Sequence, residues 1–211
     1  MLCILCRSIC TSCTAHICME CLSRFSSLYS PCLIDVSKEF DLKEQLYVYS
    51  MFPYEGVVRE LINLVKVEEN SYALDCFLYL WSYFLDSDES ISIDKNSYTL
   101  SMPYSLYSRI RLKYPLASLM RVRLDNIYKT IALPEYWMGG FDITKRSRQK
   151  FKGQNPYGAP KVRKTLLRDL IIVDDVVTTG YSYARLSGVY KANNVLGLCF
   201  AYSPGLSFRK N

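Results

Sequence analysis

Apolar positions are spaced along this chain in ways that predict strands alternating with helices. Residues 46–51 (LYVYSM) are aromatic and apolar and favour a strand, whereas the apolar positions within 57–65 have the spacing of one helix face. A second helix is predicted from the cap offered by Asn70 and Ser71 as far as Leu85. Its apolar stretch is about half as long as a membrane-spanning helix, so we expect a buried helix.

The middle of the chain continues the pattern less regularly. Residues 98–102 (YTLSM) favour a strand that stops at Pro103, and a basic helix is expected over residues 106–125. Glycines and prolines recur within 135–160 and predict a long irregular segment. Long segments of this kind are usually either functional or mobile.

The clearest supersecondary signal comes near the end of the sequence. Residues 170–173 (LIIV) are all apolar, as expected of a central parallel strand that is covered on both faces. We expect this strand to end at Asp174 and Asp175, with a helix over 182–192 and a further strand over 195–201. The unit predicts an α/β fold with a mostly parallel sheet and helices on both faces, in which ligands bind at the carboxyl ends of the strands.

The cysteines are concentrated at the start of the chain. Six of the nine form three C-x-x-C pairs within the first 21 residues, which favours metal ligation in a reducing compartment over a disulfide framework. Rival ligand sets that use Cys10, Cys13 or His16 are alternatives, as is an iron–sulfur cluster. A zinc-ribbon-like module is therefore expected over 1–40, ahead of an α/β domain over 41–211. The preferred ligands of a structural Zn²⁺ are the outer two pairs: Cys3, Cys6, Cys18 and Cys21.

Basic residues are concentrated in one part of the chain. Residues 109–168 carry 15 Lys/Arg and 3 Asp/Glu, although the net charge of the whole chain is only +6. Such a block attracts polyanions, and the tyrosines interleaved with it offer the stacking faces that single-strand binders use. A solvated basic face is the alternative interpretation. The candidate DNA contacts are Arg109, Arg111, Lys113, Arg121 and Arg123.

The segment 171–182 (IIVDDVVTTGYS) combines the parts of a sugar-phosphate site. Two adjacent carboxylates, Asp174 and Asp175, can each accept a hydrogen bond from a ribose hydroxyl. A glycine and several hydroxyl side chains at the start of a helix can surround a phosphate with donors. A capped strand-to-helix turn without a ligand is the alternative. The candidate residues after the acid pair are Val177, Thr178, Thr179, Gly180, Tyr181 and Ser182.

This segment resembles the phosphoribosyl diphosphate (PRPP) motif of type I phosphoribosyltransferases. The resemblance implies that domain's fold, with Asp174 and Asp175 on the ribose 2- and 3-hydroxyls and the loop 178–182 on the 5-phosphate. Met102 and Pro103 match in part the start of the pyrophosphate-side loop of such proteins. Mg²⁺ is expected to accompany PRPP, because the highly charged pyrophosphate needs neutralising.

The order of motifs along the whole chain resembles the ComF (ComFC) family of bacterial competence proteins. Cysteine knuckles come first, a Tyr54-x-Gly56-x-x-Arg59 segment leading to Lys66 follows, and the PRPP loop lies near the end. The family's Arg-Gly-Phe-Asn-Gln signature is absent from this sequence. The resemblance covers nearly the whole chain and is strongest at its two ends.

The resemblance implies a competence factor in natural transformation. Such a protein is cytoplasmic, binds PRPP and handles internalised single-stranded DNA at the inner face of the cytoplasmic membrane, with peripheral membrane association and a helicase-like partner. No secretory signal pattern precedes Cys3, which also favours the cytoplasm. The alternative is an active phosphoribosyltransferase that joins PRPP to a nucleobase or another acceptor. The sequence identifies no general base for that reaction, since Glu135, Asp142 and Lys66 lie in no catalytic motif.

Overall fold

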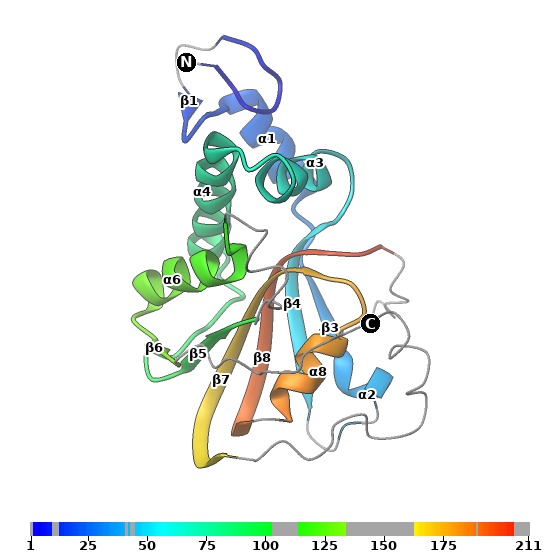
Figure 1. Ribbon diagram of the computed structural model, residues 1–211, viewed down its shortest axis with the longest axis vertical. Helices are drawn as coiled ribbons and strands as arrows, with labels where there is room; N and C mark the ends of the chain where they lie inside the picture. The colour runs from blue at the N-terminus through cyan, green and yellow to red at the C-terminus, as the bar shows by residue number, and fades with distance from the viewer. Residues whose placement is uncertain are drawn as a thin grey trace.

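The chain folds around a six-stranded, mostly parallel sheet with helices (Figure 1). The computed structural model describes residues 2–9, 13–40, 42, 45–102, 114–133, 163–188 and 190–204. The strand order is β3-β4-β8-β7-β5-β6, in which β3 pairs antiparallel with β4 and all other neighbours are parallel. The strands are β3 Cys32–Asp35, β4 Leu46–Pro53, β5 Tyr98–Ser101, β6 Ile131–Ala132, β7 Arg163–Val177 and β8 Tyr190–Tyr202.

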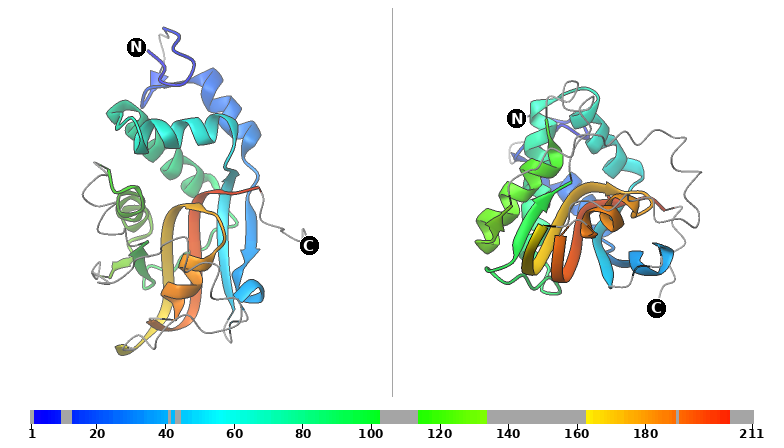
Figure 2. Two further views of the ribbon diagram at one scale, coloured as in Figure 1. Left: turned by 45° about the vertical axis from the view of Figure 1, so that its right-hand side comes forward. Right: turned by 60° about the horizontal axis from the view of Figure 1, so that its bottom comes forward.

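Helices cover both faces of this sheet. Figure 2 shows α3, α4 and α6 on one side and α2 and α8 on the other. The cysteine-rich segment lies beyond α3 and α4, at the end of the molecule farthest from α8 (Figure 1). The helices are α1 Met19–Leu28, α2 Val36–Phe40, α3 Gly56–Lys66, α4 Ser71–Ser87, α6 Leu116–Tyr128 and α8 Tyr181–Ser187.

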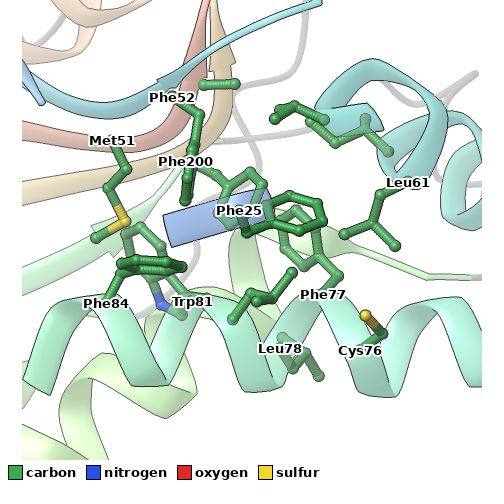
Figure 3. Packing of buried hydrophobic residues seen from close by; sticks show 14 of the residues in the cluster. Phe25, Met51, Phe52, Leu61, Cys76, Phe77, Leu78, Trp81, Phe84 and Phe200 are labelled. Carbon is green, nitrogen blue, oxygen red and sulfur yellow. The ribbon is translucent and has the colours of Figure 1, made fainter. Parts of the chain in front are cut away.

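An aromatic cluster fills the space between the sheet and α4. Phe77 and Trp81 of α4 meet Phe25 of α1 and Phe200 of β8, all of them buried (Figure 3). The rings of Phe77 and Phe200 lie 4.5 Å apart, and the indole of Trp81 donates to the carbonyl of Met120, so its one polar group is satisfied. Cysteines of the N-terminal segment join the same cluster: Cys3, Cys18 and Cys21. The apolar interior is therefore continuous across residue 40.

A second cluster lies on the opposite face of the sheet. Successive side chains of β7 alternate between the two, with Ile171 and Val173 in the first cluster and Ile172 in the second. Tyr183 of α8 is buried in the second cluster and donates to the carbonyl of Leu198. The all-apolar run in the middle of β7 is thus explained by burial on both faces, as predicted for a central parallel strand.

Several predicted elements are confirmed. The strand over 46–51 is β4, the helix over 57–65 is α3, and the helix that starts at Asn70 is α4. The Asn70 side chain caps α4 by accepting from the backbone N–H groups of the second and third helical residues. The expected strands over 98–102 and 195–201 correspond to β5 and β8.

Several boundaries in the last β-α-β unit differ from the prediction: β7 begins at Arg163 rather than at residue 170, and β8 begins at Tyr190 rather than at residue 195. The strand does not end at Asp174 and Asp175, because β7 stays paired with β8 as far as Val177. The following helix is shorter than expected, since α8 ends at Ser187 and Tyr190 already begins β8.

In the middle of the chain, α6 accounts for the later part of the expected basic helix. Residues 103–113 and the expected irregular segment 135–160 lie outside the described residues. Within the described ranges, no helix combines the length and the apolar character that a bilayer-spanning segment needs.

Candidate functional site

Four cysteines near the N-terminus converge on one point. The sulfur atoms of Cys3, Cys6, Cys18 and Cys21 all lie within 4.8 Å of one another. Cys6 and Cys18 are 3.7 Å apart, sulfur to sulfur, which agrees with the separation of about 3.8 Å expected between thiolates of a tetrahedral zinc site. The four predicted ligands are thus brought together, and they could hold a metal ion such as zinc.

The local fold prepares these cysteines for a metal. Cys18 ends the short hairpin of β1 (Cys13–Thr14) and β2 (Ile17–Cys18), and it is also the N-cap residue of α1. Backbone N–H groups point at the sulfurs: that of Cys18 donates to Cys3, and that of Cys21 donates to Cys18. Hydrogen bonds from Ser8 lower the pKa of the Cys6 thiol to about 6, whereas burial raises the pKa of the Cys21 thiol well above its ordinary value. The four sulfur atoms are therefore a suitable donor set for a metal ion that is bound by four thiolates.

The rival ligands lie outside this cluster. His16 turns its ring to Tyr72 of α4, with 4.5 Å between the ring centroids. Cys13 belongs to β1 and is not one of the four grouped sulfurs, and Cys10 falls outside the described residues. Among the described residues, the outer two cysteine pairs thus make up the candidate metal site.

A second candidate site lies where the chain changes direction across the sheet. From β7 the chain crosses through α8 to β8 on one side, whereas from β5 it crosses through α6 to β6 on the other. The two connecting helices pack mainly in different apolar clusters, on opposite faces of the sheet. Open α/β sheets bind ligands at the carboxyl ends of the strands beside such a switch point. Here that point lies between β5 and β7.

The acid pair lies at this point. Asp174 and Asp175 are near the carboxyl end of β7, and the backbone N–H of Met102, just after β5, donates to the carbonyl of Val173. The backbone N–H of Asp175 donates to the carboxylate of Asp174 at 2.9 Å. The pair therefore lies beside the switch point, close to the carboxyl end of β7, and the buried Met102 lies next to it.

The two carboxylates have different surroundings. Asp175 is buried and forms an ion pair with Lys66, the last residue of α3, at 2.7 Å. Burial and the neighbouring charge of Asp175 raise the pKa of Asp174 to about 8, and the charge of Lys66 opposes that rise. The site thus combines Asp175, which is ion-paired, with Asp174, whose carboxyl group keeps its proton until the pH rises above neutral.

The loop after β7 carries hydroxyl groups into solvent. Thr178 and Thr179 are exposed and Ser182 is half-buried, so the hydroxyls that sequence analysis assigned to phosphate are accessible. The Thr179 hydroxyl accepts from the backbone N–H of Tyr181, and Gly180 has a φ of +74°, in the left-handed region. The loop turns within three residues of the end of β7, which keeps these hydroxyls close to the acid pair.

One helix from the first 40 residues, α2, packs against this loop through its first and last residues. A β-carbon on Gly180 would lie 2.8 Å from Cγ2 of Val36, the first residue of α2. Phe40, the last residue of α2, packs edge-on against Tyr181 with 5.9 Å between ring centroids. These contacts could not be predicted from the sequence, because the segment that forms α2 carries no motif that relates it to residues 178–182.

Lys66 is the other site residue that the sequence did not assign. It is part of the segment that led to the family resemblance, but no local pattern predicts its ion pair with Asp175. The pairing of β4, β8 and β7 as neighbours brings the helix after β4 beside the end of β7. Only the folded sheet therefore reveals this contact.

Only two of the five candidate DNA contacts, Arg121 and Arg123, lie among the described residues. Arg109, Arg111 and Lys113 lie outside the described residues, as does Pro103 of the expected pyrophosphate-side loop. Arg121 is on α6 with its side chain only 13% exposed, 3.6 Å from a carboxylate oxygen of Asp125. Arg123 is exposed on the same helix. Of the two described arginines, Arg123 is thus the accessible one.

Comparison of this chain with protein-family models and with curated proteins found no match. The interpretation of both sites therefore depends on their geometry and on the sequence motifs described above.

Proposed function

We propose that this chain binds phosphoribosyl diphosphate at the switch point between β5 and β7. One observation carries the proposal: an acid pair and a hydroxyl-rich turn lie together at the carboxyl end of the same central strand. Adjacent carboxylates suit the neighbouring hydroxyls of a ribose, and a turn with accessible hydroxyls suits a phosphate. A ribose 5-phosphate carries both groups.

The roles of the residues follow from this placement. Asp174 and Asp175 accept hydrogen bonds from the ribose 2- and 3-hydroxyls, and the loop from Thr178 to Ser182 holds the 5-phosphate. The left-handed Gly180 lets the backbone approach the phosphate without a side chain between them. Mg²⁺ neutralises the pyrophosphate, a role suited to a hard cation that retains several waters. The resemblance to the type I phosphoribosyltransferase motif supports these assignments.

The wider role that we propose is that of a competence factor in natural transformation. It depends on the resemblance to the ComF family, which also suggests cytoplasmic single-stranded DNA, a helicase-like partner and peripheral membrane association. The exposed Arg123 on α6 and the basic character of 109–168 agree with a polyanion nearby. Zinc in the four-cysteine site is proposed to hold the N-terminal segment against α3 and α4.

Calorimetric titration with Mg²⁺ and PRPP tests the sugar site. At pH 9, where Asp174 is ionised, the wild type should bind, and a double variant with Asp174→Asn and Asp175→Asn should lose at least about tenfold in affinity, because each amide removes a charge-assisted acceptor. A matched control is Asp169→Asn on the same strand, where the aspartate accepts from Asn194 instead. Equal affinity of the wild type and the double variant would exclude the assignment of the ribose hydroxyls.

An active phosphoribosyltransferase is the second candidate. The raised pKa of Asp174 favours it, since a proton acceptor works best when its pKa is near the operating pH. Incubation with Mg²⁺, PRPP and a panel of nucleobases, followed by measurement of pyrophosphate release, separates the two functions. Release that depends on a base identifies a transferase, whereas binding without release identifies PRPP as a ligand.

A further inference from the structure

Lys66 makes an ion pair that differs from the others found among the described residues. Its Nζ atom lies 2.7 Å from Oδ2 of Asp175, within the range of a charge-assisted hydrogen bond. The side chain of Asp175 is 6% exposed and that of Lys66 is 30% exposed. The other ion pairs between two described residues join positions at most four apart along the chain. This one joins the end of α3 to the end of β7.

The charges around the acid pair show what Lys66 contributes. Two adjacent carboxylates repel each other when both are ionised, and burial adds to the cost. The titratable groups that face the pair from neighbouring elements are Lys66 of α3, Tyr183 of α8 and Cys199 of β8, and Tyr54, before α3, faces Lys66. Within this described set, Lys66 carries the positive charge that offsets the repulsion.

The effect is mutual. Burial is the largest single influence on the pKa of Lys66 and acts to lower it, but the charge of Asp175, its hydrogen bond with Lys66 and the charge of Asp174 together outweigh burial, and the pKa is raised. The lysine therefore stays charged. Its positive charge in turn favours the ionised form of Asp174, which is the form that accepts hydrogen bonds from hydroxyl groups.

We infer that Lys66 is a positioning residue of the sugar site, whose ion pair holds the Asp175 carboxylate in one orientation so that the acid pair can accept hydrogen bonds from a vicinal diol. The inference rests on the proposed function, and it adds a residue from α3 to a site that the sequence placed on β7, the loop after it and Met102–Pro103. A purely structural tie between α3 and β7 is the competing explanation. If Lys66 is a positioning residue, its charge affects proton binding by Asp174 and Asp175. If it is only a structural tie, its charge does not.

Three variants separate these explanations. Lys66→Met removes the charge, Lys66→Arg retains it, and Arg168→Met removes a charge from the exposed ion pair with Asp169 on the same strand. Carbon-13 NMR of the carboxyl groups follows the titration of the acid pair in the ligand-free protein. Calorimetry with Mg²⁺ and PRPP from pH 6 to pH 9 follows binding. Lys66→Gln repeats both measurements should Lys66→Met fail to fold.

The charge role predicts a specific pattern. In Lys66→Met the titration of the acid pair should move to higher pH by about one unit or more, because the ionised form has lost its neighbouring cation. Affinity for PRPP at neutral pH should fall by about tenfold or more, and the loss should shrink as the pH rises and the pair ionises. Lys66→Arg should retain most of the affinity, and Arg168→Met should behave as the wild type.

The outcomes remain separate from those of the proposed function. An unchanged titration of the acid pair in the neutral Lys66 variants overturns the inference, whether or not PRPP binds. So does a loss of PRPP affinity that is equal at every pH, since a structural tie alone would cause it. If the wild type binds no PRPP while the titration still shifts, the proposed function fails and the control of the acid pair by Lys66 stands.

Discussion

Val36 packs against Gly180 so closely that a β-carbon at position 180 would lie 2.8 Å from Cγ2 of Val36. Val36 begins α2 and Gly180 precedes α8, so the contact fixes the turn that follows the acid pair. Gly180 also has a φ of +74°, a conformation that residues with a β-carbon rarely adopt. Both conditions require glycine at this position.

Gly180→Ala should therefore lower the free energy of unfolding by more than the cost of the backbone conformation alone, which is about 1–2 kcal/mol. Gly56→Ala is the matched control, because Gly56 also has a positive φ but a β-carbon there would meet nothing within 4 Å. Urea unfolding measures both. If the two variants lose the same stability, the contact with Val36 does not constrain the loop. PRPP affinity should fall in Gly180→Ala only.

The metal site gives a prediction about the whole chain. Purified protein should carry about one zinc ion per chain. Cys18→Ser should remove the zinc, because a four-thiolate site that loses one of its ligands loses most of its affinity for the metal. Cys32→Ser is the control, since Cys32 is a half-buried cysteine outside the cluster. Elemental analysis by mass spectrometry measures the metal. Iron in place of zinc would contradict the assignment.

Removal of this metal should destabilise more than the N-terminal segment. Cys3, Cys18 and Cys21 share one apolar cluster with α3 and α4, so disorder around the metal site would expose part of the main core. A chelator should therefore lower the midpoint of the single thermal transition. A separate early transition with an unchanged main one would show that the segment unfolds independently.

The central fold could be predicted because its signals are local. Caps, helical spacing and an apolar run each depend on neighbouring residues, and they identified β4, α3, α4 and the middle of β7. The end of α8 could not be predicted in the same way. Tyr190 and Ala192 suit either a helix or a buried strand, and only pairing with β7 selects the strand.

The candidate sites show the same division. The spacing of the cysteines and the sequence around Asp174 and Asp175 are local patterns, so the residues of both sites could be named in advance. The contacts of Lys66 with Asp175 and of Val36 with Gly180 join distant parts of the sequence. They arise from the strand order, which places α3 beside the end of β7 and α2 beside the loop that follows it. No sequence pattern in α2 or α3 indicates these contacts.

The acid pair also predicts how stability depends on pH. The pKa of Asp174 is raised to about 8 by burial and by Asp175, so between its ordinary value near 4 and about pH 8 the folded state binds more protons than the unfolded state. This residue therefore contributes stability that is present at low pH and is lost as the pH rises through that window. In Asp174→Asn the free energy of unfolding should therefore fall less steeply as the pH rises.

Urea unfolding of the wild type and Asp174→Asn from pH 5 to pH 9 measures this effect. The difference between the two free energies of unfolding removes the contributions of other carboxyl groups, such as Asp35, whose pKa is lowered chiefly by a hydrogen bond from Ser37. A difference that stays constant over the whole range would show that Asp174 does not hold its proton in the folded state.

The two described arginines of the DNA prediction should behave differently. Arg121→Gln should lower the free energy of unfolding by about 1–3 kcal/mol, because a largely buried charge beside Asp125 is removed. Arg123→Gln should leave stability unchanged, weaken single-stranded DNA binding and reduce the slope of log affinity against log salt by about one. Fluorescence anisotropy at several salt concentrations measures the slope. Wild-type affinity and slope in Arg123→Gln would mean that this arginine contacts no phosphate.

The most direct test of the central claim is a crystal structure of the chain with Mg²⁺ and PRPP. We predict the ribose 2- and 3-hydroxyls within hydrogen-bonding distance of Asp174 and Asp175, and the 5-phosphate in the loop from Thr178 to Ser182. Lys66 should still contact Asp175 in the complex. PRPP bound at any other place, or an acid pair that contacts no part of the sugar, would contradict the account.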